Sequence, residues 1–501
     1  MKAIQTDLLT PSDRMSSVEK DWIYNGLDCA VTLEVFNAIA PQLDNLSGAT
    51  YAFERDLQGP ILDMNLRGIL VDQEARRLAI HEYQAIVDRL AWQLERLLRE
   101  GLGVTNLNWR SPDQLKRLFY EVMGLPPVKF KGKETVNRDA LEKLQATYFL
   151  SEPLIGHILT LRDIGKKISV LKTSVDPDGR IRTSFNIAGT NTGRLSSSLS
   201  EFGESGGNLQ NIEQRLRRVF IADPGQKFAY IDLEQAESRA VGAIEWNLFH
   251  DGRYLDACES GDLHTTVCKM AWSHLPWTGN LAADRQVAEA PFYRQHSHRH
   301  MAKVLGHGSN YMGQPHTMEK HTKVSRDVIS TFQSVYIPAF AHKQWWDAVA
   351  VQLKEFGYLI SLSGRRRWFF GRPTDPETIR GAVAFDPQGS VGDILNTGML
   401  KVWRLNIAEL MLQVHDAILV QYPQEKEDEI VPRLIEEIKV TIPLEFGRSL
   451  TIPSEAKTGW NWADADQNNP DGLKKYKGGD ARARTCDANR SILDRAVSSI
   501  Y

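Results

Sequence analysis

The 501-residue sequence has only four cysteines, Cys29, Cys258, Cys268 and Cys486. They lie far apart and form no pair at the spacing of a metal or redox motif, so neither a disulfide framework nor a structural zinc is expected. No apolar run approaches the roughly eighteen residues that cross a membrane, and the N-terminal MKAIQTDLLT has no apolar signal core. We therefore expect a cytoplasmic protein, neither secreted nor membrane-bound.

Charge of one sign is not in excess, because 60 lysines and arginines face 63 aspartates and glutamates, a net charge of −3. Net charge therefore does not indicate nucleic-acid binding, and such a site must come from local clusters. Ten basic and six acidic residues lie between Arg162 and Arg218, and Arg365–Arg367 form a second cluster. Neighbouring serine, threonine, asparagine and glycine residues suit phosphate contacts. An ordinary solvated face explains these clusters about equally well.

The length indicates two or more domains, and apolar periodicity predicts both helices and strands. Helices are expected at 51–68, 74–99 and 235–244 and over most of 264–348, and another begins at Ser111-Pro112. Strands are expected at 69–71, 181–187 and 227–233, and on both sides of His415-Asp416 within 410–422. The polar tail after Trp462 is expected to be a mobile extension rather than part of the core.

Two aspartates occupy positions that a sheet could bring together. Asp232 closes the strand at 227–233, and Asp416 lies in the turn between the two later strands. Carboxylates at such positions project into the groove above a sheet, where they could hold two divalent cations about 3.5–4 Å apart for phosphoryl or nucleotidyl transfer. Taken singly, Asp232 is better explained as a helix cap and Asp416 as a turn residue.

Several motifs in a fixed order resemble those of the family A DNA polymerases, the group of bacterial DNA polymerase I and many phage replicases. They are TNTGRLSS at 190–197 with NLQNI at 208–212, DLEQAESR at 232–239, the series Arg299, Lys303, Gly308 and Tyr311, the segment from Arg380 to Gln388-Gly389, and QVHD at 413–416. One motif could arise by chance, but the ordered set is specific. The resemblance covers about Tyr24 to Trp462.

The resemblance implies an α+β fold shaped like a right hand, with an antiparallel-sheet palm, a helical thumb and helical fingers. The implied division is an exonuclease remnant at 1–45, palm at 46–72, 180–242 and 381–462, thumb at 73–179, fingers at 243–380 and a polar C-terminal extension at 463–501. The implied activity is DNA-templated extension of a primer 3′ end with dNTPs, which releases pyrophosphate.

The resemblance also implies site residues. Asp232 and Asp416 would bind two Mg²⁺ ions, or Mn²⁺ in their place, with the backbone carbonyl of Leu233 as a further ligand. Nucleotide contacts are implied for Gln235, Glu237, His264, Arg299, Lys303, His307 and Tyr311. Contacts with primer-template DNA are implied for Arg194, Asn208, Gln210, Asn211, Arg239, Arg380, Gln388, Gln413 and His415.

The chemistry of the nucleotide residues fits these roles. Arg299 and Lys303 are four residues apart, so they share a helix face where both could hold a triphosphate. By the resemblance, Glu237 pairs with Tyr311 and blocks the space that a ribose 2′-hydroxyl needs. Because a carboxylate and a phenol that satisfy each other leave no partner for an extra hydroxyl, ribonucleotides would be rejected and DNA favoured as the product.

Four positions depart from the family pattern. His307 stands where phenylalanine or tyrosine is usual; it can still stack on a nucleotide but adds a titratable ring. Ala417 follows Asp416 where glutamate is common, so a third acidic residue is missing from this motif, and Glu234, in place of a usual serine, could compensate in part. Ala384 replaces a usual asparagine, which puts one template contact in doubt. Both metal-binding aspartates remain.

The N-terminal segment YNGLD at 24–28, with AVTL at 30–33, resembles the last motif of a 3′–5′ exonuclease domain. Only 23 residues precede it, so we expect the rest of that domain and the 5′ nuclease domain to be absent, as in a phage replicase without proofreading. Three explanations remain open. A separate exonuclease polypeptide docks here, the chain was shortened at this point, or a relic helix covers the palm or thumb with Ile23, Leu27, Val31 and Leu33.

Two other functions compete with polymerisation. A metal-dependent nuclease could use Asp28, but Asp28 lacks acidic companions in the sequence, whereas Asp232 and Asp416 each lie in a full motif. A non-catalytic DNA-binding subunit could keep the polymerase shape, but loss of one aspartate would be its signature and both are present. Primer extension with Mg²⁺ and four dNTPs separates all three.

Overall fold

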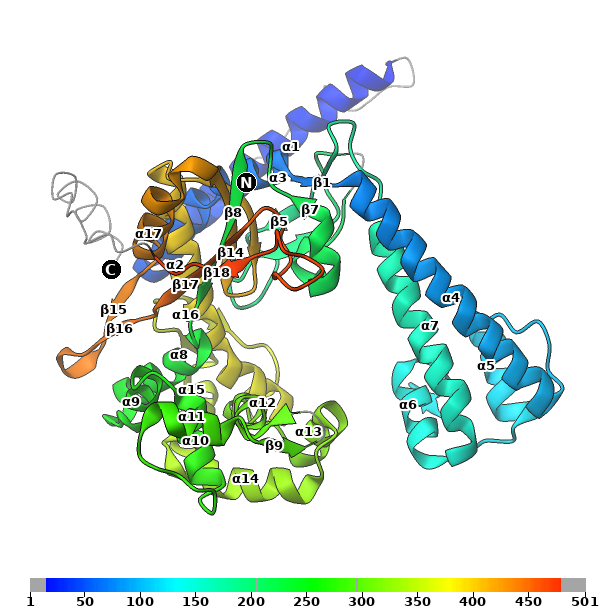
Figure 1. Ribbon diagram of the computed structural model, residues 1–501. Coiled ribbons are helices and arrows are strands. Elements are labelled where there is room, and N and C mark those ends of the chain that lie inside the picture. The colour runs from blue at the N-terminus through cyan, green and yellow to red at the C-terminus, as the bar shows by residue number, and fades with distance from the viewer. Residues whose placement is uncertain (1–14, 204–205, 294–295, 479–501) are drawn as a thin grey trace.

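The computed structural model describes residues 15–203, 206–293 and 296–478. A central unit carries a five-stranded sheet, a long helical hairpin projects from it, and a second helical unit lies on its other side, as Figure 1 shows. Each of these three parts has its own hydrophobic core. Within the described ranges, no helix is both long and apolar enough to span a membrane.

The central unit is assembled from three stretches of the chain. Its helices are α2 (Asn45–Asp56), α3 (Gln58–Arg67), α16 (Pro376–Arg404) and α17 (Glu427–Glu437). Its strands are β1 (Ile69–Val71), β4 (Arg180–Ile181), β5 (Ser184–Asn186), β6 (Ser196–Ser198), β7 (Phe220–Ile221), β8 (Gln226–Leu233), β13 (Glu409–Val414), β14 (Ala417–Pro423), β15 (Thr441–Pro443), β16 (Ser449–Thr451), β17 (Ser454–Gly459) and β18 (Lys474–Lys475).

The main sheet is antiparallel with the strand order β13-β14-β8-β17-β18. Its middle strands are apolar on both faces: Ile231 in β8 and Ile418 to Val420 in β14 are fully buried. Burial of each such side chain is worth about 1.5–3 kcal/mol, so these strands anchor the unit. The predicted strands at 227–233 and around His415-Asp416 are therefore confirmed, as is the predicted combination of helices with an antiparallel sheet.

The projecting hairpin is formed by α4 (Gln73–Leu102) and α7 (Glu152–Leu171), the blue and cyan helices of Figure 1. Asp72 caps the start of α4, and Gly103, with a φ of +66°, ends it in the left-handed conformation that glycine adopts easily. At its far end lie α5 (Pro112–Lys116), the π-helical turn η3 (Arg117–Val122), the strand pair β2 (Lys129–Phe130) and β3 (Lys133–Glu134), and α6 (Arg138–Thr147). The predicted helix at 74–99 and the helix start at Ser111-Pro112 are confirmed.

The second helical unit follows β8 in the chain. It contains α8 (Ala236–Phe249), α9 (Arg253–Glu259), α10 (Leu263–Ala271), α11 (Leu281–Ala288), α12 (His298–Asn310), α13 (Pro315–Thr322), α14 (Arg326–Ala339) and α15 (His342–Phe356). Two short antiparallel pairs accompany them, β9 (Pro291–Tyr293) with β10 (His296–Ser297) and β11 (Tyr358–Ile360) with β12 (Arg366–Trp368). The helices expected at 235–244 and over 264–348 are present.

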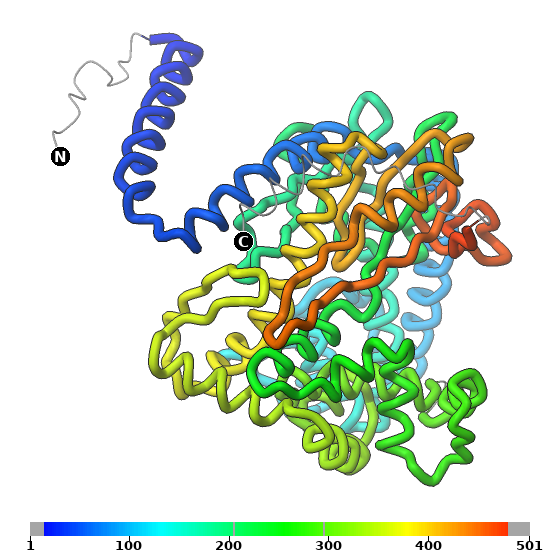
Figure 2. Tube along the Cα trace, turned by 90° about the vertical axis from the view of Figure 1, so that its left-hand side faces the viewer, coloured from blue at the N-terminus to red at the C-terminus, as the bar shows by residue number. Residues whose placement is uncertain are grey.

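Helix α1 (Ser17–Ile39) stands away from the rest of the protein, as Figure 2 shows. All of its residues are described and none is buried. Val31 and Leu33 are 48% and 59% exposed. The explanation that this helix covers apolar surface of the palm or thumb is therefore wrong.

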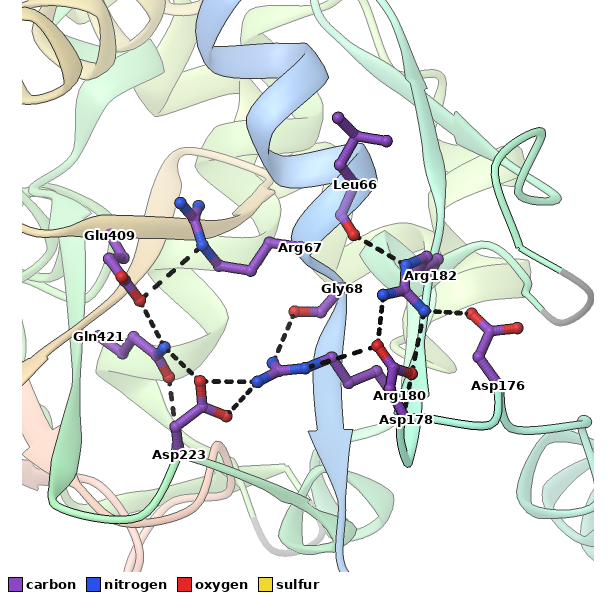
Figure 3. Close-up of polar contacts among 10 residues, drawn as sticks. All are labelled: Leu66, Arg67, Gly68, Asp176, Asp178, Arg180, Arg182, Asp223, Glu409 and Gln421. Atoms are coloured by element: carbon purple, nitrogen blue, oxygen red, sulfur yellow. Dashed lines mark hydrogen bonds and ion pairs between the residues drawn. The ribbon is translucent and has the colours of Figure 1, made fainter.

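A network of ion pairs ties β4 and the end of α3 to the main sheet (Figure 3). Arg180 binds both carboxylate oxygens of Asp223 at 2.6 and 2.7 Å, and Gln421 of β14 donates to Asp223 at 2.8 Å. Arg182 pairs with Asp178 at 2.5 Å and donates to the Leu66 carbonyl at 2.8 Å. Charge-assisted bonds of this kind fix orientation as well as adding stability, so the first segment of the central unit has a defined position on the sheet.

Three details correct the predictions. The helix expected over 51–68 is two helices with a break at Leu57, and 181–187 is two short strands that pair in different sheets. The chain after Trp462 does not leave the core, because Leu473 is buried and β18 pairs with β17 as the edge strand of the main sheet. The expected extension therefore begins too early at 463, and residues 479–501 lie outside the described residues.

Candidate active site

The register of the sheet brings Asp232 and Asp416 together. Ala417, the first residue of β14, lies opposite Asp232 at the end of β8, so the turn residue Asp416 lies beside that strand end. The backbone amide of Leu233 donates to the Asp416 carbonyl at 3.1 Å and holds the turn in place. Both aspartates line one cavity of about 380 Å³.

Two residues beside these aspartates adopt a left-handed backbone conformation that is uncommon outside glycine. His415 has a φ of +55° and opens the two-residue turn between β13 and β14; Gln235 has a φ of +54° and precedes α8. A positive φ at the first turn residue matches the twist of a tight hairpin. Such strain of about 1–3 kcal/mol collects at functional sites, where the surrounding structure enforces it.

The cavity gathers side chains from the central unit and from the second helical unit. Of the sequence-predicted residues, it is lined by Arg194, Asp232, Leu233, Gln235, Glu237, His264, Lys303, His307, His415 and Asp416. The remaining lining residues are Ala236, Ser238, Tyr254, Leu263, Val267, Ala302, Gly306 and Tyr336. One side of the cavity is therefore acidic and the other carries lysine and histidine.

The pKa values of Asp232 and Asp416 are both raised above those of free aspartate. Burial, and then the charges of Asp416 and Glu455, raise the pKa of Asp232 to about 6. Burial also raises the pKa of Asp416, although the charge of Arg194 acts in the opposite direction. Two half-buried carboxylates that repel each other form a donor set suited to a hard divalent cation, because oxygen ligands and a positive charge relieve both effects.

The carboxylates here are fewer than a protein-only metal site needs. Among the described residues, no group of three or more histidine, cysteine, aspartate or glutamate side chains has the geometry to hold a metal ion. A cation bound to Asp232 and Asp416 would thus need backbone, water or substrate oxygens to complete its coordination, as is usual for magnesium at phosphate-processing sites.

Arg194 lies between the two halves of the acidic side. One of its terminal nitrogens donates to Glu237 at 2.6 Å and to Asp416 at 3.3 Å. Its Nε donates to the backbone carbonyl of Gln388 in α16 at 3.2 Å. The Thr190 hydroxyl donates to the backbone carbonyl of Arg194 at 2.8 Å. The guanidinium is consequently held between the Gln388 carbonyl on one side and the Glu237 and Asp416 carboxylates on the other.

Glu237 has a second partner in Tyr311. The Tyr311 hydroxyl donates to Glu237 at 2.5 Å, and burial followed by the charge of Glu237 raises the pKa of Tyr311 far above its ordinary value. The phenol therefore stays protonated and remains a donor. His307, which is exposed, lies 3.8 Å from Glu237 and meets the Tyr311 ring edge-on at 5.3 Å between centroids. The predicted pairing of Glu237 with Tyr311 is present in the structure.

The basic side of the cavity differs from the expected arrangement at one residue. Lys303 of α12 lines the cavity, together with His264 at the start of α10. Burial, and then the charges of Arg299 and Lys303, lower the pKa of His264 to about 4, so this ring is neutral at pH 7. Arg299, one turn before Lys303, is bound to Asp262 at 3.0 Å and is not among the residues that line the cavity, so its joint contact with a triphosphate stays a prediction.

The residues expected to contact DNA divide into exposed and buried ones. Asn208, Asn211 and His415 are exposed, and Arg380 and Gln388 are half-buried on α16. Gln413 is buried; it accepts from Gln210 at 2.9 Å and donates to the His415 carbonyl at 2.8 Å, so it helps to orient both neighbours.

Arg239 is also buried. It donates to the backbone carbonyls of Glu234 and Cys258 at 3.2 and 3.0 Å, and these bonds join α8 to α9. The side chains of Arg239 and Gln413 are thus engaged within the protein, and their contacts with DNA stay predictions.

Sequence reasoning missed several residues beside the cavity. Glu455 lies directly opposite Asp232 in the β17–β8 pairing, and opposed residues in antiparallel strands have neighbouring side chains. Lys475 of β18 binds Glu455 at 2.5 Å. Alternation along β17 would indicate which of its residues share a face, but only the pairing identifies the neighbour. Tyr254 and Tyr336, which hydrogen-bond each other at 2.9 Å, were also missed because they lie in unremarkable helical sequence.

Comparisons with known proteins agree with this geometry. The sequence profile described as DNA polymerase family A matches residues 79–464. The thermostable DNA polymerase I of Thermus filiformis is 27% identical over 466 residues, covering 87% of this chain and 50% of that protein. The DNA polymerase I of Chloroflexus aurantiacus is 28% identical over 480 residues, covering 89% of this chain and 47% of that one. The chain thus spans about half the length of these relatives.

A solved structure shares the architecture. The POL domain of Pol1 from M. smegmatis, solved with a DNA primer-template and a dNTP, superposes with a TM-score of 0.65 at 24% identity and covers 82% of this chain and 70% of that one. This similarity confirms the predicted fold. Since the family profile also covers well over half of the sequence, the chain belongs to DNA polymerase family A.

Proposed function

We propose that this chain is a DNA-templated DNA polymerase that extends a primer 3′ end with dNTPs and releases pyrophosphate. The observation that carries the proposal is the meeting of Asp232, at the end of β8, and Asp416, in the turn before the neighbouring β14, in a cavity that Lys303 and His264 also line. The family relatives and the neighbour solved with primer-template and dNTP support it.

The residues divide the work by charge. Asp232 and Asp416 would hold two Mg²⁺ ions, with the Leu233 carbonyl as a further ligand. When bound, these ions would lower the pKa of the primer 3′-hydroxyl and offset charge that develops at the α-phosphate. Lys303 is placed to neutralise the triphosphate, and the neutral His264 can hydrogen-bond to it without adding charge.

The palm, thumb and fingers follow from this assignment. We assign the sheet-containing unit to the palm, the α4–α7 hairpin to the thumb and the unit from α8 to α15 to the fingers. Asn208, Asn211, Arg380, Gln388 and His415 would then meet primer or template, mainly through phosphate, sugar and minor-groove contacts that carry little sequence information.

Primer extension with Mg²⁺ and four dNTPs tests the proposal. Asp232→Ala and Asp416→Ala should each reduce extension by about a thousandfold or more, because each removes a cation ligand. Binding of primer-template should change little, since phosphate contacts of lysine and arginine supply most affinity for DNA. Asp347→Ala, which removes an exposed carboxylate of α15, serves as the control and should match wild type. Near wild-type extension by either cavity variant would reject the assignment.

We further propose a phage replicase without intrinsic proofreading, with a separate exonuclease polypeptide that docks on α1. What supports docking is the uncovered state of this helix: Trp22, Tyr24 and Leu33 are 69%, 64% and 59% exposed. Apolar residues lie on all sides of α1, and helices of this kind are normally enclosed by protein. Affinity purification from the native source tests the partner, and recovery of no exonuclease-like chain would reject it.

A further inference from the structure

We propose that Arg194 is a built-in counter-cation of Asp416, which it releases when primer-template DNA binds, so that DNA binding and cation binding are coupled. The inference rests on the proposed function. Its basis is that one guanidinium nitrogen is shared between Glu237, at 2.6 Å, and Asp416, at 3.3 Å. Among the described residues, Arg194 is the only cationic side chain within ion-pair distance of Asp416.

The position of Arg194 is enforced by its surroundings. Its Nε is bound to the Gln388 carbonyl, and its side-chain stem runs over Gly392 of α16, where an added Cβ would lie 3.0 Å from the Arg194 Cγ. The Glu237 carboxylate keeps the Tyr311 hydroxyl as a donor whether or not Arg194 is present. Asp416 has no such substitute among the described residues, so its charge depends most on the arginine.

A guanidinium and a divalent cation compete for the same carboxylate oxygens. While Arg194 is paired with Asp416, cation binding must break that ion pair, which weakens affinity in the absence of DNA. Arg194 is also a residue that we expect to contact primer-template. DNA acceptors that draw the guanidinium away would free Asp416, and linkage requires that a bound cation strengthen DNA binding by the same factor.

The consequence is an order of events. Cations would occupy the carboxylates firmly only once a primer-template is in place, so a free enzyme would hold few cations at concentrations that saturate the DNA complex. Coupled sites typically differ by about 5–150-fold, and a single half-exposed ion pair belongs at the lower end of that range.

A Mn²⁺ titration tests the coupling without relying on catalysis. Free Mn²⁺ is measured by its electron paramagnetic resonance signal. In the absence of DNA, Arg194→Met should bind Mn²⁺ about tenfold more tightly than wild type. A non-extendable primer-template should tighten Mn²⁺ binding about tenfold in wild type and much less in Arg194→Met. Arg194→Lys, which keeps the charge but not the forked contact, should fall between them.

Two matched variants separate the ion pair from general electrostatics. Lys303→Met removes a positive charge from the same cavity, but among the described residues Lys303 forms no ion pair with Asp232 or Asp416, so this change should tighten Mn²⁺ binding clearly less than Arg194→Met. Arg180→Ala breaks an ion pair of similar exposure with Asp223; neither residue lines the cavity, so Mn²⁺ binding should be unchanged.

The outcomes are distinct. Equal Mn²⁺ affinity of wild type and Arg194→Met without DNA would overturn the inference, as would equal tightening by Lys303→Met. If the coupling fails but wild type extends primers and Asp232→Ala does not, the proposed polymerase function still stands. If circular dichroism shows that Arg194→Met is unfolded, two other measurements decide: Mn²⁺ binding by Arg194→Lys, and the effect of DNA on Mn²⁺ binding by wild type. If Arg194→Lys binds Mn²⁺ no more tightly than wild type and DNA does not tighten Mn²⁺ binding, the coupling is rejected.

Discussion

At the scale of single residues, Glu237 combines two contacts that would constrain the nucleotide sugar under the proposed function. It accepts from Tyr311 at 2.5 Å and from Arg194 at 2.6 Å, so both carboxylate oxygens are engaged. A ribose 2′-hydroxyl that entered this space would displace one of these donors and leave it unsatisfied. Rejection of such a group is strong when buried polar atoms lose their partners.

We predict that Glu237→Ala lowers the preference for dNTPs over rNTPs on the order of a hundredfold, measured as the ratio of kcat/KM values for single-nucleotide insertion. Tyr311→Phe keeps the bulk of the ring but removes the donated hydrogen bond, so it should lower the ratio less. Unchanged discrimination in Glu237→Ala would show that another residue guards the 2′ position.

His307 presents an exposed ring at the cavity, beside Tyr311. If this ring stacks on the incoming base, His307→Ala should raise KM for dNTPs about five- to a hundredfold, since base–aromatic stacking is worth about 1–3 kcal/mol. His307→Phe and His307→Tyr should keep KM near wild type. His300→Ala, an exposed histidine on the same helix outside the cavity, is the control. Equal KM values for wild type and His307→Ala would contradict stacking.

At the scale of elements, the position of Asp416 depends on hairpin geometry and that of Asp232 on helix packing. Asp416 is held by the left-handed turn at His415, and Asp232 precedes α8, which packs closely on α9. Gly242 makes this approach feasible: an added Cβ would lie 2.7 Å from the backbone nitrogen and Cα of Leu255. This close contact between α8 and α9 fixes the position of α8, and therefore that of Glu237.

We predict that Gly242→Ala destabilises the protein by about 1–3 kcal/mol, because a backbone contact cannot move aside as a flexible side chain would. Gly156→Ala, in the second turn of α7, is the matched comparison. Its added Cβ would meet only the Gln145 amide at 3.6 Å, so helix propensity should stabilise the chain by about 0.5–1 kcal/mol. Urea unfolding measures both, and equal changes of one sign would contradict the packing argument.

At the scale of the whole molecule, α1 is the part that the polymerase fold does not enclose. It lies outside the residues that the family profile matches, and Figure 2 shows it projecting from the body. Asp28, the acidic residue of the resembled exonuclease motif, is exposed on this helix. Since metal-dependent 3′ cleavage needs several carboxylates around the cations, α1 by itself offers no such site.

We predict that the 501-residue chain extends primers but does not shorten a labelled single-stranded 3′ end when dNTPs are withheld. Asp28→Ala should change neither extension nor this absence of cleavage. Shortening that depends on Mg²⁺, persists in Asp232→Ala and disappears in Asp28→Ala would show proofreading within the chain and refute the prediction.

The sequence alone determined the fold class, most long elements and the identity of the two aspartates. Helices such as 74–99 and strands such as 227–233 carry local periodicity and capping signals, which act over a few residues and need no tertiary information. The ordered motifs around Asp232 and Asp416 likewise pointed to the site, through their resemblance to the motifs of family A polymerases.

Only the tertiary structure decided which charged groups meet. Arg239 and Gln413 belong to matching motifs, yet both are buried in structural contacts, and Arg299 is bound to Asp262 instead of lining the cavity. Glu455 lies opposite Asp232. Arg194 contacts both Glu237, which is 43 positions away in the sequence, and Asp416, which is 222 positions away. Such pairings depend on strand register and on long-range packing, and neither leaves a local periodic signal in the chain.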